Sequence, residues 1–238
     1  MLEAAIEKKL GWGGRRVGAG RPKGRWRSDP PHRSRTPFAS DAPIHVVLRA
    51  CSWIDSFRQR RVYQVTNRVL ARYLGLDDFR VVHFSIQTNH FHFLIEAANQ
   101  DVLSRRMQSL VITLAKAINR ALGLIGKVFQ FRYHDTVITT ARQARSSLSY
   151  VLNNWRKHVQ HCKGGRVSQR ALDPYASGRA LDGWCAPVET DGPLTLPVSP
   201  PRTRLLRSDW RRFGPLDPYD TPGLRNLSTS LRHRSALV

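Results

Sequence analysis

The sequence is poor in acidic residues, and it has no apolar run long enough to cross a bilayer. Only 17 Asp and Glu residues stand against 39 Lys and Arg residues, so the formal net charge is +22. This excess is far above what solubility requires and predicts a polyanionic partner. Because the basic residues are spread along the whole chain, a nucleic acid is favoured over a membrane surface. The first residues lack the apolar stretch of a signal peptide, and we expect a cytoplasmic, nucleoid-associated protein.

Cysteine is scarce as well. Cys51, Cys162 and Cys185 are odd in number, lie far apart and form no CxxC pair. A disulfide framework and a thiolate zinc site are therefore not indicated.

Both ends of the chain lack apolar periodicity. Residues 1–42 are rich in Gly, Pro, Ser and Arg, which predicts a disordered basic arm. Residues 163–238 form a Pro- and Arg-rich extension, with five prolines between 186 and 203. Within it, the stretch TRLLRSDWRRFGPL (203–216) is compatible with a short helix that docks on the domain. The folded domain is therefore expected at 43–162.

Apolar spacing within 43–162 predicts alternating strands and helices. The helix that ends before Gly75 has a basic outer face. A tight turn at Thr88 and Asn89 joins two strands into a hairpin, and the next helix is expected to start at an Asp101 N-cap and end at Gly123. The expected elements are a strand at 43–50, a helix at 57–75, strands at 79–87 and 90–97, a helix at 101–123, an extended segment at 127–140 and a helix at 141–161.

This β-α-β-β-α-β-α order predicts the α+β class. Its first six elements match the ferredoxin-like, or split βαβ, arrangement, with both helices on one face of an antiparallel sheet and the other face open. The last helix is an addition to that arrangement, and irregular basic tails flank the whole.

Two histidines mark the strand at 90–97. His90 and His92 share one face, whereas Phe91, Phe93 and Ile95 project to the other. The two imidazoles could hold one metal ion on the open face. Alternatively, they are simply polar residues on the wet side of a sheet.

Tyr150 and Asn154 lie one turn apart on the last helix, about 150° from the centre of its apolar stripe at 100° per residue. Tyr150 could act as a nucleophile, and the amide oxygen of Asn154 could complete a metal site with His90 and His92. The alternative is a tyrosine that merely contacts solvent or the tail.

Three segments resemble a known family, the single-tyrosine HUH transposases of the insertion-sequence type, and within it the REP-associated tyrosine transposases. NHFHFLIE (89–96) resembles the family's histidine strand, FQFRYHDTVITT (129–140) the segment before its catalytic helix, and LSYVLNNWRKH (148–158) the tyrosine helix. The resemblance implies DNA transposition: Tyr150 would cut single-stranded DNA, with ends that fold into hairpins, and form a 5'-phosphotyrosine. This is metal-dependent endonuclease and recombination chemistry.

The resemblance implies a divalent ion on His90, His92 and Asn154. Two imidazoles suit Mn²⁺ better than Mg²⁺, but an open site with water and phosphate oxygens admits both. We expect either ion to support activity, with Mn²⁺ at least as good. His45, His83 and His134 are isolated in the sequence, so a structural or DNA-contact role is expected for each.

Basic residues outside this set are candidates for DNA binding. Gly20-Arg21-Pro22, with Lys23 and Arg25, resembles an AT-hook, which lies in the minor groove of A·T-rich DNA. A nonspecific polybasic tail explains the same residues equally well. In the domain, the DNA-binding candidates are Arg105, Arg106, Arg132 and Lys157.

The leading hypothesis is thus a DNA-nicking and strand-transferring enzyme that binds no membrane, as a monomer or a homodimer. The alternative is a non-catalytic DNA- or RNA-binding protein that uses the same basic sheet. RNA-binding sheets of this kind normally expose aromatic side chains on their central strands, whereas Phe91 and Phe93 are expected to face inward.

Overall fold

The computed structural model describes residues 37–38, 42–162, 172–188 and 195–222. The predicted DNA-binding residues Arg21, Pro22, Lys23 and Arg25 lie outside this part of the chain. Within it, no helix is both long and apolar enough to cross a membrane.

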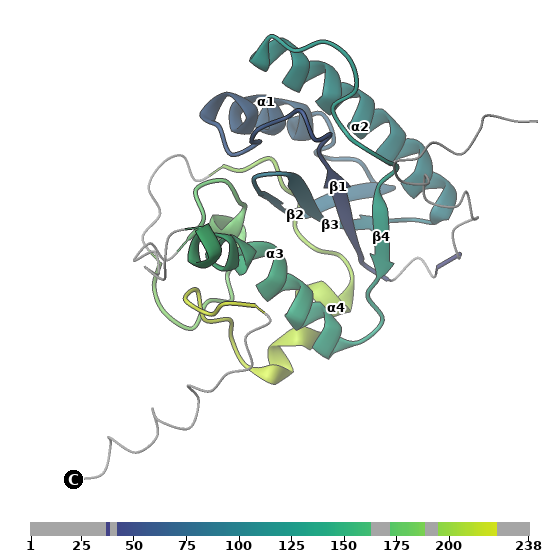
Figure 1. Cartoon of the computed structure of the whole chain (residues 1–238). Coiled ribbons are helices and arrows are strands. Elements are labelled where there is room, and N and C mark those ends of the chain that lie inside the picture. Colours follow the sequence, from purple (N-terminus) through teal and green to yellow (C-terminus); the bar gives the residue numbers. More distant parts are fainter. Residues whose placement is uncertain (1–36, 39–41, 163–171, 189–194, 223–238) are drawn as a thin grey trace, which may run out of the picture. The chain divides into compact units, whose positions relative to one another are not determined.

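A four-stranded antiparallel sheet forms the centre of the fold (Figure 1). The strands are β1 (Ile44–Arg49), β2 (Phe79–Ile86), β3 (His90–Ala97) and β4 (His134–Val137), in the spatial order β2-β3-β1-β4. β3 pairs with both β1 and β2 and therefore lies between them, and each neighbouring pair is antiparallel. This is the split βαβ arrangement, and the predicted α+β fold class is confirmed.

Two helices cover one face of the sheet, α1 (Arg60–Ala71) and α2 (Gln100–Leu122) (Figure 1). The end of α2 at Gly123 is as predicted, because this glycine takes the left-handed conformation with φ 67°. The Asp101 N-cap is wrong. Asn99 is the residue with extended backbone, and its side chain accepts a hydrogen bond from Val102 N, while Asp101 lies inside the first turn.

The odd-numbered residues of β3 are apolar because they face the core beneath α1 and α2. Phe91, Phe93 and Ile95 are completely buried there, against apolar side chains of both helices. The predicted inward direction of the aromatic residues is therefore confirmed, and base stacking on this strand is excluded.

The opposite face of the sheet is covered, and the prediction of an open face is wrong. α3 (Ala141–Cys162) packs there together with α4 (Arg204–Arg207) and the turn of 3-10 helix at Asp209–Phe213 (Figure 1). Apolar side chains on this face make an open sheet unfavourable: Val82 and Leu94 join the α3 residues and the fully buried Trp210 in a second core.

Polar contacts fix the C-terminal extension on this second face. The carboxylate of Glu96, on β3, accepts hydrogen bonds from the backbone N–H groups of Arg202 and Thr203 and from the Thr203 hydroxyl. Along the edge of β2, Ser177 N donates to Phe84 O, and the Ser177 hydroxyl lies 3.1 Å from His83 Nδ1. Much of the extension is thus part of the folded unit.

Candidate functional site

Three strands bring histidines to one place on the second face. Antiparallel pairing sets His90 opposite Arg49 and His92 opposite Val47, and Val47 in turn lies opposite His134 on β4. His92 is almost fully buried beneath α3, with 2% of its surface exposed, whereas His90 is only partly buried. His92 therefore lies inside the protein, and His90 lies nearer its surface.

The two predicted metal ligands of β3 face each other. His90 Nε2 lies 2.8 Å from His92 Nε2, with the rings edge-on at an interplanar angle of 87°. On its far side, His90 Nδ1 lies 2.7 Å from Asn89 Oδ1. When that nitrogen carries the proton, His90 Nε2 keeps its lone pair for a ligand.

Helix α3 delivers Tyr150 and Asn154 to the same histidine. Its apolar residues Leu148, Val151 and Leu152 are buried in the second core, and this orients the helix over β3. The Tyr150 ring then stands edge-on to His92, with centroids 5.2 Å apart, and 36% of the tyrosine surface remains exposed. Asn154 is buried, and its Nδ2 lies 3.4 Å from His92 Nε2.

His45 joins the cluster although it is isolated in the sequence. Its Nε2 lies 3.0 Å from His92 Nδ1, and its ring is edge-on to Tyr150 at 5.8 Å. Burial and, to a lesser extent, the charge of the nearby His134 lower the His45 pKa to about 4. A neutral His45 can accept a hydrogen bond from the protonated Nδ1 of His92. The lone pair of His92 is then on Nε2, which faces His90.

A pocket of about 730 Å³ opens beside these side chains. Tyr150, His90 and His92 line it together with His45, and Arg49 adds a positive charge at its wall. The remaining wall is polar. It consists of Asn89, His134, Thr136, Ser146 and Ser147, with the aliphatic Val47.

The donor set fits a divalent ion of the kind expected. Two nitrogens bound at about 2.1 Å to one ion and at right angles are about 3.0 Å apart, close to the 2.8 Å between the two Nε2 atoms. A half-turn of the Asn154 amide would place its oxygen toward the same point. No group of three or more His, Cys, Asp or Glu side chains suited to a metal occurs in the described part of the chain. The Asn154 amide, 3.4 Å from His92 Nε2, is the candidate for a third protein ligand.

The predicted DNA-binding residues of the domain lie elsewhere than the pocket lining. Arg105 is exposed on α2. The neighbouring Arg106 forms an ion pair with Asp78, in which its Nη2 lies 3.0 Å from Oδ1 and 2.9 Å from Oδ2. Arg132 and Lys157 are exposed. Arg49 was missed, since only the register between β1 and β3 brings it beside His90.

No protein-family model matches the sequence, and no curated protein matches it. Among solved structures, the chain is similar to a REP-associated tyrosine transposase bound to a REP hairpin. The two share 16% sequence identity and a TM-score of 0.46, over 69% of this chain and 93% of that one. Similarity at this level assigns no activity to the chain.

Proposed function

We propose that this protein cleaves and rejoins single-stranded DNA through Tyr150, with a divalent metal ion held by His90, His92 and Asn154. The observation that carries the proposal is that α3 places two polar side chains beside one imidazole of the distant strand β3. The Tyr150 ring centroid lies 5.2 Å from that of His92, and Asn154 Nδ2 lies 3.4 Å from His92 Nε2. A hydroxyl nucleophile beside a pair of metal-binding imidazoles is suited to phosphodiester chemistry.

The reaction conserves the energy of the bond that is cut. The Tyr150 hydroxyl oxygen attacks the phosphorus, the bond from phosphorus to the 3' oxygen breaks, and a 5'-phosphotyrosine forms. The tyrosine proton passes, directly or through water, to the 3' oxygen, which leaves as a hydroxyl. Attack by a 3'-hydroxyl on the phosphotyrosine reverses the step and joins strands.

Each side chain has a separate task. The metal ion, when bound, would polarise the phosphate and offset the negative charge that develops on it. His45 holds the His92 ring through the 3.0 Å contact, Tyr150 is positioned by the buried face of α3, and Arg49 offers its charge to the DNA backbone.

The experiment is a search for the covalent adduct. The full chain is incubated with Mn²⁺ and an end-labelled DNA hairpin that carries single-stranded flanks from the region around its own gene, and adducts are separated on denaturing gels. Wild type should form a labelled adduct. Tyr150→Phe should form none, a loss of at least about a thousandfold, because the nucleophile is absent while the ring contacts remain.

A matched control removes a different hydroxyl. Tyr219 is also exposed and packs on Arg156 of α3, so Tyr219→Phe should form the adduct as wild type does. Equal adduct formation by Tyr150→Phe and wild type, or no adduct with any flanking DNA, would refute the proposal.

The alternative of a non-catalytic nucleic-acid-binding protein makes the opposite prediction. Such a protein would bind the same hairpin without an adduct, and its affinity would not change when Mn²⁺ is removed with a chelator. The enclosed cluster around His92 favours the catalytic proposal, since simple binding of a DNA backbone needs exposed cations rather than buried imidazoles.

A further inference from the structure

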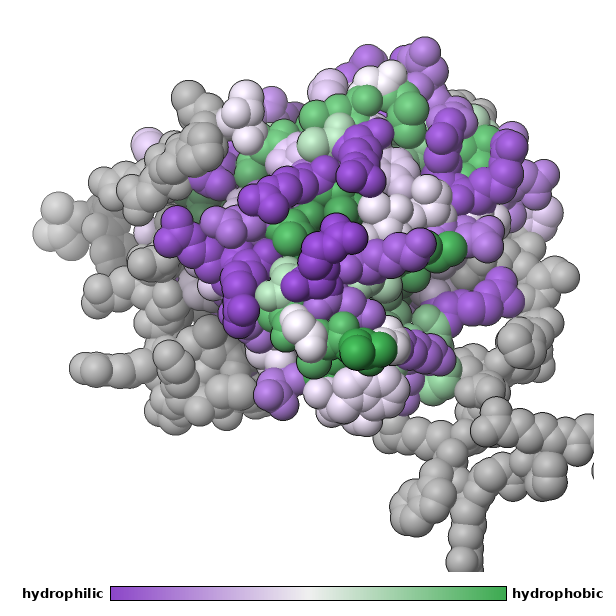
Figure 2. Space-filling view, turned by 90° about the horizontal axis from the view of Figure 1, so that it is seen from above, coloured by the Kyte–Doolittle hydropathy of each residue, from purple (hydrophilic) through white to green (hydrophobic). Residues whose placement is uncertain are grey.

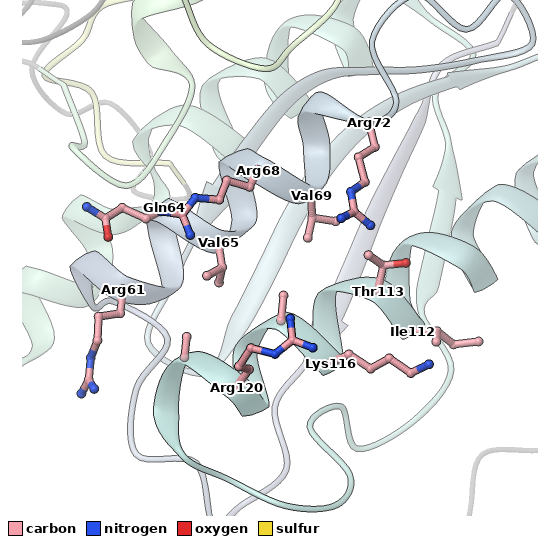
Figure 3. Close-up of a pocket in the computed structure, with 12 residues that line it drawn as sticks. Arg61, Gln64, Val65, Arg68, Val69, Arg72, Ile112, Thr113, Lys116 and Arg120 are labelled. Atoms are coloured by element: carbon pink, nitrogen blue, oxygen red, sulfur yellow. The ribbon is translucent and has the colours of Figure 1, made fainter.

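A second hollow lies on the other face of the sheet from Tyr150, between α1 and α2 (Figure 3). Its volume is about 680 Å³, and residues of both helices line it. We call it the α1–α2 groove. Five basic side chains define it: Arg61 and Arg68 from α1, Arg72 at the C-cap of α1, and Lys116 and Arg120 from α2.

No acidic side chain of the described residues lines the groove beside its cations. Within the described part of the chain, none of the five is in an ion pair, whereas Arg58, Arg106 and Arg202 elsewhere are paired with aspartates. Like charges held close together repel, and this cost is relieved when an anion binds between them.

The spacing along each helix sets the cations in rows. Arg72 is the C-cap of α1, still in helical conformation and one turn after Arg68, and Lys116 and Arg120 are one turn apart on α2. One turn is about 6 Å along each axis. In Figure 3 the guanidinium groups of Arg72 and Arg120 both extend toward the gap between the helices. An extended anion with regularly repeated charges fits two such rows better than a single small anion does.

The floor of the groove narrows the choice of partner. It is aliphatic, with Val65, Val69 and Ala117, and no aromatic residue lines the groove. Figure 2 views this face and shows hydrophilic side chains around exposed apolar atoms. Proteins that hold single strands usually stack bases on aromatic rings, so a groove without them suits the outer backbone of a duplex.

We propose that the α1–α2 groove binds the sugar-phosphate backbone of a nucleic-acid duplex, without reading its bases. The site is remote from Tyr150, and binding there does not depend on whether Tyr150 cleaves DNA. Contacts to phosphates release condensed counterions, so affinity at this groove falls steeply with salt.

The test removes one cation from each wall, with the double variant Arg68→Gln and Arg120→Gln in the full chain. Fluorescence anisotropy measures binding to a blunt 20-base-pair duplex between 50 and 200 mM salt. We expect a loss of affinity of about tenfold at the higher salt, and a salt slope smaller by about 2, because each phosphate contact contributes about 0.9.

The matched control removes the same charge elsewhere, with Arg207→Gln and Arg212→Gln, two exposed residues of the C-terminal extension. This variant should bind the duplex within about twofold of wild type, since its net charge changes equally but the groove is intact. Thermal melting verifies that both variants are folded.

Three results would overturn the proposal. Equal losses in the two variants would mean that only net charge matters. A 20-nucleotide single strand that loses affinity in the groove variant while the duplex does not would assign the groove to unpaired chains. Loss of binding to anionic phospholipid vesicles, with duplex binding unchanged, would assign it to a membrane surface.

Discussion

The two faces of the sheet differ in what their polar side chains contact. Around His92 they contact one another: His45, His90 and Asn154 all lie within 3.4 Å of its ring nitrogens. In the α1–α2 groove, Arg68, Arg72 and Arg120 form no ion pair within the described residues. Preorganised, partly buried groups are what chemistry on a bound molecule requires, whereas exposed, unopposed charges are what backbone binding requires. The contrast predicts separable functions for the two faces.

The largest effect on the Tyr150 face is expected from His92→Ala. This change removes one imidazole and the anchor for both Tyr150 and Asn154, and we expect adduct formation to fall by about a thousandfold. Mn²⁺ binding, measured by electron paramagnetic resonance, should fall with it. His134→Ala, in the same pocket wall, is the control and should retain both Mn²⁺ and the adduct within a few-fold. Full adduct formation by His92→Ala would remove the metal site from the mechanism.

A smaller effect is expected from His45→Phe, which preserves a ring but removes the acceptor for His92 Nδ1. Loss of such an outer contact typically weakens metal binding by about 10- to 100-fold. Mn²⁺ affinity should change by that amount while the melting temperature stays close to that of wild type. His45→Gln, whose amide oxygen can replace the accepting nitrogen, should recover most of the affinity. If Phe and Gln behave alike, His45 does not position His92.

Acid should destabilise the second face through His83, whose pKa burial lowers to about 4, although the Ser177 hydrogen bond and Asp182 oppose this. In the unfolded chain we expect the ordinary histidine pKa of about 6.5. Between these values the unfolded state binds a proton that the folded state does not, so stability is complete above pH 6.5 and falls as the pH drops toward 4. From pH 7.5 to pH 5 the loss is about 2 kcal/mol for this one histidine.

Urea unfolding at both pH values measures this loss, and His83→Asn removes the titration while it leaves a polar group for Ser177. The difference in unfolding free energy between pH 7.5 and pH 5 should be smaller in His83→Asn than in wild type. An unchanged difference would place the acid sensitivity elsewhere.

The smallest effect is expected when a change on the groove face is measured by the reaction on the Tyr150 face. With a short single-stranded oligonucleotide that reaches only the Tyr150 pocket, the groove variant Arg68→Gln and Arg120→Gln should form the adduct within about twofold of wild type. A loss as large as that expected of His45→Phe would show that the groove and the pocket act as one site, and that the two faces have no separable functions.

Local sequence patterns predicted most of the fold. Alternation on β3 and the stripes on α1, α2 and α3 established the order of elements, because side-chain direction follows from the period of each structure. The errors came from longer range. Asp101 and Asn99 are both capping residues by composition, and only the backbone conformation distinguishes them. The open face was predicted because the irregular composition of the extension concealed that Trp210 and Leu216 would bury against α3.

The sequence by itself determined that His90 and His92 share a face, that Tyr150 and Asn154 share another, and that basic residues dominate the chain. Spacing suffices for this, since it is a property of a single strand or helix. Tertiary structure alone decided that these pairs meet, that His45 supports His92, and that the cations of α1 and α2 flank one groove. Such contacts depend on strand register and helix packing, which bring together residues far apart in the chain.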